Sequence, residues 1–150
     1  MQHMKAVIIA AAVVGILGIA WFYSAPYFAL KELKTQAANG DEIAQFNLGV
    51  LYAKGQGVPQ DYAKARELFE KAAAQGNADG QVRLGMLYAY GGGVPQDYAK
   101  AHMWLSLAAT QGNKDVAKER DKVAMKMTPA QLVEAQRLVQ QCQARQYKGC

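Results

Sequence analysis

The sequence is poor in the residues on which catalytic and metal sites depend. It contains two histidines, His3 and His102, and two cysteines among 150 residues. No nucleophile with a neighbouring base, no working pair of acids and no metal-ligand cluster is assembled along the chain, and His102 has no visible partner. The glycine run from Gly91 to Gly93 lacks the spacing of a phosphate-binding loop. We therefore expect no enzyme activity, no metal and no cofactor.

Runs of basic residues interleaved with aromatics are also absent, which argues against nucleic-acid binding. The chain has 17 lysines and arginines against 12 aspartates and glutamates, a formal net charge of +5. This mild excess favours anionic surroundings such as lipid headgroups or acidic partners. We expect protein partners, no nucleic acid and no small-molecule substrate.

One long apolar run is present, because the 18 residues from Ala6 to Tyr23 carry no charge. As a helix this run would extend roughly 27 Å, close to the thickness of a hydrocarbon core. Trp21, Phe22 and Tyr23 end the run with the aromatic residues of a membrane interface, which favours a retained transmembrane anchor. Small residues just before them offer a weak cleavage site, so a cleaved signal peptide is the alternative.

The two cysteines, Cys142 and Cys150, lie close to the C-terminus. An even pair behind an export signal is typical of a disulfide in an oxidising compartment, and a structural zinc site would need four ligands. We expect a Cys142–Cys150 disulfide, with two free thiols as the alternative. The domain would then lie in the periplasm behind a single-pass inner-membrane anchor, or be secreted to the periplasm after cleavage.

The nine residues GVPQDYAKA occur twice, at Gly57 to Ala65 and at Gly93 to Ala101. Aligned without a gap, residues 44–79 (copy one) and 80–115 (copy two) share 22 identities in 36 positions. Such a period is the signature of a tandem structural unit. Stacking two such units buries apolar faces that neither unit can bury alone.

Apolar residues recur at helical spacing twice in each copy, which predicts helices over 42–54, 61–75, 78–90 and 97–111. The first helix of each copy should end at glycines, which tolerate the positive φ of a tight turn. The second helix should begin at an aspartate that caps the first-turn N–H groups, and Thr128 should cap a final helix. The turn and cap positions are Gly55, Gly57, Asp61, Gly91, Gly93, Asp97 and Thr128.

Glycines also lie inside the first helices, where Gly costs about 1 kcal/mol relative to Ala. Gly49 and Gly85 occupy the same place in the two copies. Together with the alanine pairs of the second helices, they predict a seam of small residues along which the paired helices approach closely.

Two segments, LGVLYAKGQGVPQDYAKARELFEKAAAQGNA and LGMLYAYGGGVPQDYAKAHMWLSLAATQGN, resemble the SEL-one-like repeat (SLR), a relative of the tetratricopeptide repeat (TPR). The resemblance implies a solenoid of antiparallel helix pairs, whose members serve mainly as adaptors and in bacteria are often exported. Some cysteine-rich bacterial relatives, with a disulfide in each repeat, bind or hydrolyse penicillin-like compounds. Neither full repeat of this chain contains a cysteine, so this activity is not expected here.

The predicted fold class is all-α, a short α-solenoid of antiparallel helix pairs (SLR/TPR-like) preceded by one transmembrane helix. Residues 1–25 form the anchor and residues 26–43 a half-repeat helix and junction. Residues 44–79 and 80–115 form the two repeats, and residues 116–150 form capping helices and a tail.

Positions that differ between the copies are candidates for partner contact, because identical positions maintain the scaffold. On the first helix these positions are three and four residues apart and so share one face. Copy two places Arg, Met and Tyr there, residue types that are enriched in interface cores. The candidate contact residues are Asn47, Val50, Lys54, Arg83, Met86 and Tyr90. The alternative is that Met86 packs against the next unit and Tyr90 covers the loop.

A second stripe of differences lies on the second helix. There Glu67 and Lys71, expected to form an exposed ion pair, become Met103 and Leu107, beside His102. If nothing covers this stripe, His102, Met103 and Leu107 form an exposed patch and a second partner site. We expect instead that the C-terminal helix pair covers it with apolar residues, namely Val116, Val123, Met127, Leu132 and Val139.

These observations indicate a non-enzymatic adaptor or scaffold for protein–protein interaction, associated with a membrane or cell-envelope complex. One alternative is a structural accessory subunit of a large membrane complex, held mainly through its transmembrane helix. The other alternative is an envelope enzyme that binds or hydrolyses β-lactams.

Overall fold

The computed structural model of the chain describes residues 28–150. None of the helices in this range combines the length and the apolar character that a membrane-spanning segment requires. The predicted anchor at Ala6 to Tyr23, with its aromatic residues Trp21, Phe22 and Tyr23, lies outside the described residues.

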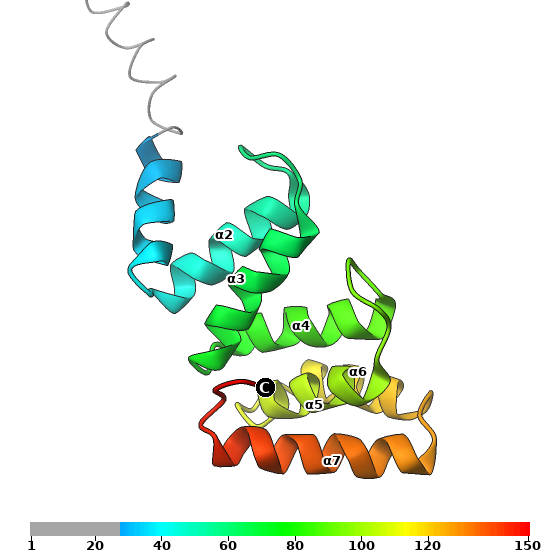
Figure 1. Cartoon of the computed structure of the whole chain (residues 1–150). Helices are drawn as coiled ribbons and strands as arrows, with labels where there is room; N and C mark the ends of the chain where they lie inside the picture. The colour runs from blue at the N-terminus through cyan, green and yellow to red at the C-terminus, as the bar shows by residue number, and fades with distance from the viewer. Residues whose placement is uncertain (1–27) are drawn as a thin grey trace, which may run out of the picture.

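Residues 28–150 fold into helices joined by turns, which confirms the all-α prediction for this part of the chain (Figure 1). Residues 28–38 are helical and precede six further helices. These are α2 (Glu42–Lys54), α3 (Tyr62–Ala74), α4 (Ala78–Tyr90), α5 (Tyr98–Ala109), α6 (Lys114–Ala124) and α7 (Pro129–Ala144). Helices α2 and α4 have the predicted bounds, and α3 and α5 are one or two residues shorter at each end.

The helices stack as pairs in chain order. Helix α2 packs against α3, α4 packs against α5, and contact between α3 and α4 joins the two pairs. Figure 1 shows the stack running from residues 28–38 to α7, with the loops that follow α2 and α4 projecting on the same side. This short solenoid is the arrangement that the duplicated sequence predicts.

Glycines end the first helix of each pair, as predicted. Gly55 and Gly91 adopt the left-handed backbone, with φ of 67° and 72°, and the N–H of each donates to a carbonyl in the last helical turn. Gly57 and Gly93 also have positive φ, of 72° and 79°. Residues with a Cβ rarely adopt these angles, which explains why glycine is duplicated at each position.

Aspartates begin the second helix of each pair, as predicted. Asp61 and Asp97 each accept a hydrogen bond through Oδ1 from the backbone N–H three residues on, at 2.9 and 3.0 Å. These N–H groups have no partner inside the helix, so the carboxylates satisfy donors that the first turn leaves open.

Replacing Asp97 with alanine is expected to lower the free energy of unfolding by about 1 kcal/mol, because the first turn of α5 loses its acceptor. Asp97→Asn should retain most of the stability, since an amide oxygen also accepts from these N–H groups. Urea unfolding followed by the helical circular dichroism signal measures both variants. Equal destabilisation by the two replacements would contradict the capping role.

The predicted seam of small residues is present between the paired helices. Gly49 and Gly85 are buried, and a methyl carbon added to either would lie 2.7 Å from a side chain of the second helix, Phe69 or Leu105. A backbone carbonyl oxygen of the second helix would lie 3.3 Å away in each case. Large side chains of the second helices therefore fill the space that the missing Cβ leaves.

Glutamines join successive units through hydrogen bonds that the sequence comparison did not identify. Gln45 and Gln81 are buried at equivalent places in α2 and α4, and the side-chain amide of each donates to a carbonyl oxygen of the preceding helix, at 3.1 and 3.4 Å. Gln75 donates to Gln45 at 2.9 Å, and Gln111 donates to Gln81 at 3.5 Å. Because buried amides require partners, these contacts fix how each unit sits on the one before it.

The last two helices complete the stack in an arrangement that the repeats do not copy. Helices α6 and α7 both pack against α5. Thr128 begins α7 with the predicted capping box, because its Oγ1 accepts from the Gln131 N–H at 3.3 Å and its own N–H donates to Gln131 Oε1 at 2.9 Å. Helix α6 ends at Ala124, and a turn leads from it to Thr128.

The apolar stripe on α5 is buried beneath α7. Met103 and Leu107 are each 1% exposed, and they share a core cluster with Cys142 of α7, against which Val139 packs. The chain therefore covers this stripe itself, as expected. The alternative of an exposed second partner patch at Met103 and Leu107 is wrong.

Helix α6 contributes to a different part of the core than predicted. Val116 and Val123 are buried in a separate cluster with Leu105 of α5, and Met127 packs against that cluster. These residues pack on another side of α5, so the cover over the α5 stripe comes from α7 and not from a C-terminal helix pair. Leu132 of α7 is half-buried.

The ion pair on α3 differs from the predicted one. Arg66 Nη1 lies 2.7 Å from Glu70 Oε1, whereas the predicted pair of Glu67 with Lys71 is not formed among the described residues. Both pairs have the i, i+4 spacing, so spacing alone could not distinguish them.

Cys142 and Cys150 form the predicted disulfide, which closes the C-terminal loop. Inside this loop Gln146 and Tyr147 adopt positive φ of 51° and 65°, angles that residues with a Cβ rarely adopt. The ring of Tyr147 packs against the core cluster that contains Met103. The bridge and this packing together hold the loop in place.

The Cys150→Ala replacement is expected to lower the free energy of unfolding by about 2 kcal/mol, because the short loop that the bridge closes regains its chain entropy in the unfolded state. Thermal unfolding with and without a reductant measures the effect. The reductant should destabilise the unmodified chain by a similar amount and leave the variant unchanged. Equal sensitivity of both chains to the reductant would contradict a stabilising bridge.

Candidate functional site

A groove between α2 and α4 gathers most of the candidate contact residues. Its volume is about 250 Å³. We call it the α2–α4 groove. Of the six candidate contact residues, Asn47 is exposed on α2 but does not line this groove. The candidates that line it are Val50, Lys54, Arg83, Met86 and Tyr90.

The α2–α4 groove has an apolar floor and a cationic rim. Phe69 of α3 is buried at the floor, with its ring 5.8 Å from that of Phe46. Lys54 and Arg83 are exposed, and Tyr90, which the alternative placed over the loop, is 62% exposed. An apolar floor bordered by aromatic and cationic side chains is typical of surfaces through which proteins contact one another.

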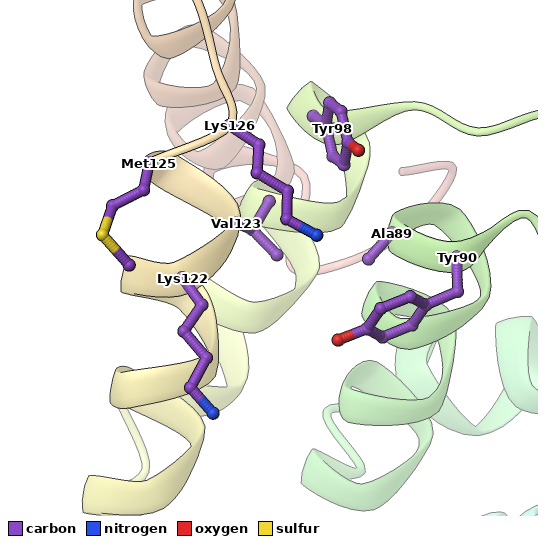
Figure 2. Close-up of a pocket in the computed structure, with 7 residues that line it drawn as sticks. All are labelled: Ala89, Tyr90, Tyr98, Lys122, Val123, Met125 and Lys126. Atoms are coloured by element: carbon purple, nitrogen blue, oxygen red, sulfur yellow. The ribbon is translucent and has the colours of Figure 1, made fainter.

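A second groove, the α4–α6 groove, lies between the C-terminal ends of α4 and α6 and has a volume of about 260 Å³. Figure 2 shows Tyr90 projecting from α4 toward α6, and Lys122 of α6 and Lys126 of the turn that follows it extending toward α4. Tyr90 lines both grooves, so the two adjoin. The lining residues are Ala89, Tyr90, Tyr98, Lys122, Val123, Met125 and Lys126.

The sequence comparison identified Tyr90, which also lines this second groove, but missed Lys122 of α6 and Lys126 of the turn that follows it. The segment that contains Lys122 and Lys126 is not duplicated in the chain. A comparison of the two copies therefore could not single these lysines out. Their i, i+4 spacing within the predicted capping helices was the available signal.

The two units that form these grooves match the family model of the Sel1 repeat, over residues 43–77 and 78–113. The chain is a Sel1 repeat protein. The match confirms the resemblance of the duplicated segments to the SLR family. Comparison with curated proteins gives no significant match.

Two solved structures are similar to this Sel1 repeat protein. One is a protective antigen present in uropathogenic Escherichia coli strains and displaying an SLR fold, with 35% identity over 87% of this chain and 29% of that chain, and a TM-score of 0.76. The other is a Sel1 repeat protein from Oxalobacter formigenes, with 43% identity over 64% of this chain and 28% of that chain, and a TM-score of 0.62. The Sel1 repeat protein described here therefore spans less than a third of either structure.

Sel1 repeats generally serve protein–protein interaction, and they are typically not enzymes. Among residues 28–150 of this Sel1 repeat protein, no three His, Cys, Asp or Glu side chains are placed to hold a metal ion. Every buried side-chain nitrogen or oxygen in the same range has a hydrogen-bond partner. What the grooves offer is recognition through apolar, aromatic and cationic side chains.

His102 is half-buried on α5 and has a partner that the sequence analysis did not assign to it. Ser106, four residues on, lies with its Oγ 3.3 Å from His102 Nδ1. Burial, and after it the nearby Arg120, lowers the pKa of His102 below its usual value, while Asp121 acts in the opposite direction. His102 is therefore neutral at neutral pH, and neither it nor Ser106 lines either groove.

Proposed function

We propose that this Sel1 repeat protein is a non-enzymatic adaptor that binds a protein partner through the α2–α4 groove. The observation that carries the proposal is that the residues which distinguish the two copies come together there: Val50 and Lys54 from copy one, and Arg83, Met86 and Tyr90 from copy two. Each of these five residues differs from its counterpart in the other copy, as expected where each unit makes its own contact. The composition of the groove matches that of interface cores.

The proposal places the repeat domain in the periplasm, held at the inner membrane by residues 1–25. The uncharged run from Ala6 to Tyr23 and the Cys142–Cys150 disulfide support this location, since disulfides persist in oxidising compartments. Confinement near the bilayer raises the effective concentration of the domain toward neighbouring membrane proteins, so a small groove can suffice. The partner in this proposal belongs to a membrane or envelope complex.

Co-purification from gently solubilised membranes tests the role of the groove. The Met86→Ser/Tyr90→Ser variant removes an apolar and an aromatic contact, and it should lose the partner that the unmodified chain retains. The control, Ile43→Ser/Val133→Ser, removes two other apolar side chains, which are 59% and 67% exposed and do not line the groove. The control should retain the partner. Equal retention by both variants would overturn the proposal.

Exchange of the anchor separates an adaptor from an accessory subunit held through its membrane helix. Residues 1–25 are replaced by an unrelated single-span segment, which keeps the domain at the bilayer. An adaptor then retains its partner, whereas an accessory subunit loses it.

Protease accessibility tests the location of the repeat domain. Protease added to spheroplasts should digest the repeat domain without lysis. Protection of the domain until lysis would place it in the cytoplasm.

A further inference from the structure

The rims of the two adjoining grooves are cationic. Lys54 and Arg83 line the α2–α4 groove, and Lys122 and Lys126 line the α4–α6 groove. Among the described residues that line either groove, none carries a carboxylate. Because Tyr90 lines both, the four cations border one surface, and this surface complements a negatively charged ligand.

Two tyrosine rings hold the lysine at the end of the α4–α6 groove. Lys126 Nζ lies 5.8 Å from the ring centroid of Tyr90 and 6.0 Å from that of Tyr98. Attraction between an ammonium and the face of an aromatic ring orients the side chain. Figure 2 shows the ammonium group directed toward α4, where an incoming carboxylate could contact it.

The second lysine already has a partner on its own helix. Lys122 donates to the carboxylate of Glu119, and this hydrogen bond raises the pKa of Lys122 above its usual value, so the lysine is charged at neutral pH. An incoming carboxylate would share Lys122 with Glu119. Lys126 has no ion pair among the described residues and is the stronger point of attraction.

The size of each groove favours a peptide side chain over a small molecule. The volumes of about 250 and 260 Å³ lie below the range of about 300 to 1,000 Å³ that is usual for small-molecule sites. The floors are apolar, with Phe69 under the α2–α4 groove and Ala89 and Val123 under the other, all three buried. An anionic lipid surface would contact the exposed lysines but would not fill these concave floors.

We propose that the partner presents an acidic peptide segment to this surface. A large apolar side chain of the segment occupies the α2–α4 groove, and carboxylates further along it contact Lys122 and Lys126 beyond Tyr90. This inference rests on the proposed function, since it names the kind of partner that the α2–α4 groove receives.

Selection from a random peptide display library tests the inference on the full-length chain in neutral detergent. The chain should enrich peptides that carry Asp or Glu near a large apolar residue. Lys122→Gln/Lys126→Gln should enrich apolar residues without the acids. The control, Lys114→Gln/Lys118→Gln, removes two exposed lysines of the same spacing from the start of α6 and should behave as the unmodified chain.

The affinity of one selected peptide separates this inference from the proposed function. Lys122→Gln/Lys126→Gln should weaken binding about tenfold at low salt, and added salt should reduce the difference. Glu119→Gln should strengthen binding because it releases Lys122. Selection of peptides without acidic residues, or equal binding of an acidic peptide to the lysine variant, would overturn the inference. The proposal that the partner binds the α2–α4 groove would be unaffected. Binding that survives Met86→Ser/Tyr90→Ser would overturn that proposal.

A membrane surface is the remaining anionic partner that the lysines could face, and the same peptide distinguishes it. Micelles that contain anionic lipid should not displace the selected peptide more than neutral micelles do. Specific displacement by the anionic lipid would assign Lys122 and Lys126 to lipid headgroups and overturn the inference.

Discussion

The Met103→Glu/Leu107→Lys double replacement is expected to lower the free energy of unfolding by at least about 4 kcal/mol, a large part of the total of a small domain. It gives copy two the residues that copy one carries at Glu67 and Lys71. In copy one these side chains are exposed, but in copy two α7 covers the stripe. Charges placed there lose their hydration, and the attraction between the two new side chains, four residues apart on α5, offsets only part of that cost. Urea unfolding followed by circular dichroism measures the loss.

The reverse exchange, Glu67→Met/Lys71→Leu, is the matched control. It should change the free energy of unfolding by less than about 1 kcal/mol, because both positions face solvent. The contrast between the two exchanges isolates the contribution of α7. A stable Met103→Glu/Leu107→Lys chain would contradict the burial of these two positions beneath α7, and with it the role of α7 in closing the end of the solenoid.

The second large effect is expected from Gly85→Val, which should lower the free energy of unfolding by about 3 kcal/mol. The added Cβ would lie 2.7 Å from Leu105 Cγ and 3.3 Å from the Ala101 carbonyl oxygen. Leu105 is fully buried and the carbonyl belongs to the backbone of α5, so neither can move aside at low cost. The better helix propensity of valine offsets less than about 1 kcal/mol. Thermal or urea unfolding measures the result.

Gly92→Ala is the control for this replacement. Its added methyl carbon would come within 2.9 Å of Leu87 Cδ2, the far end of a half-buried side chain that can rotate away. We expect a change of about 0.5 kcal/mol or less. Equal losses from Gly85→Val and Gly92→Ala would show that α4 and α5 do not depend on close approach at Gly85.

The parts of the fold that local chemistry determines were predictable from the sequence. A glycine at positive φ and a capping aspartate act within one turn of the residue that carries them, so Gly55, Gly91, Asp61 and Asp97 could be assigned by spacing alone. The duplicated pattern added the pairing of the helices. The packing of α6 and α7 on different sides of α5 could not be predicted, because it depends on shape complementarity between segments that have no copy.

The candidate site was predictable to the same extent. Comparison of the copies identified five residues that meet in the α2–α4 groove, because the same helix face recurs in adjacent stacked units. Asn47 lies on the same face of α2, about one helical turn before Val50, but does not line the groove. Helical spacing alone could not separate it from the residues that do. The α4–α6 groove depends on how α6 docks, so Lys122 and Lys126 emerged from the structure.

Site-specific photocrosslinking in the cells that produce the protein tests the central claim most directly. A photoreactive phenylalanine derivative replaces Tyr90 or, as a control, Tyr62, a tyrosine of α3 that is 46% exposed and lies outside both grooves. We predict that the chain crosslinks to one partner of defined mass from position 90 and not from position 62. Crosslinking from position 62 alone, while the partner still co-purifies with both chains, would contradict the assignment of the α2–α4 groove as the contact surface.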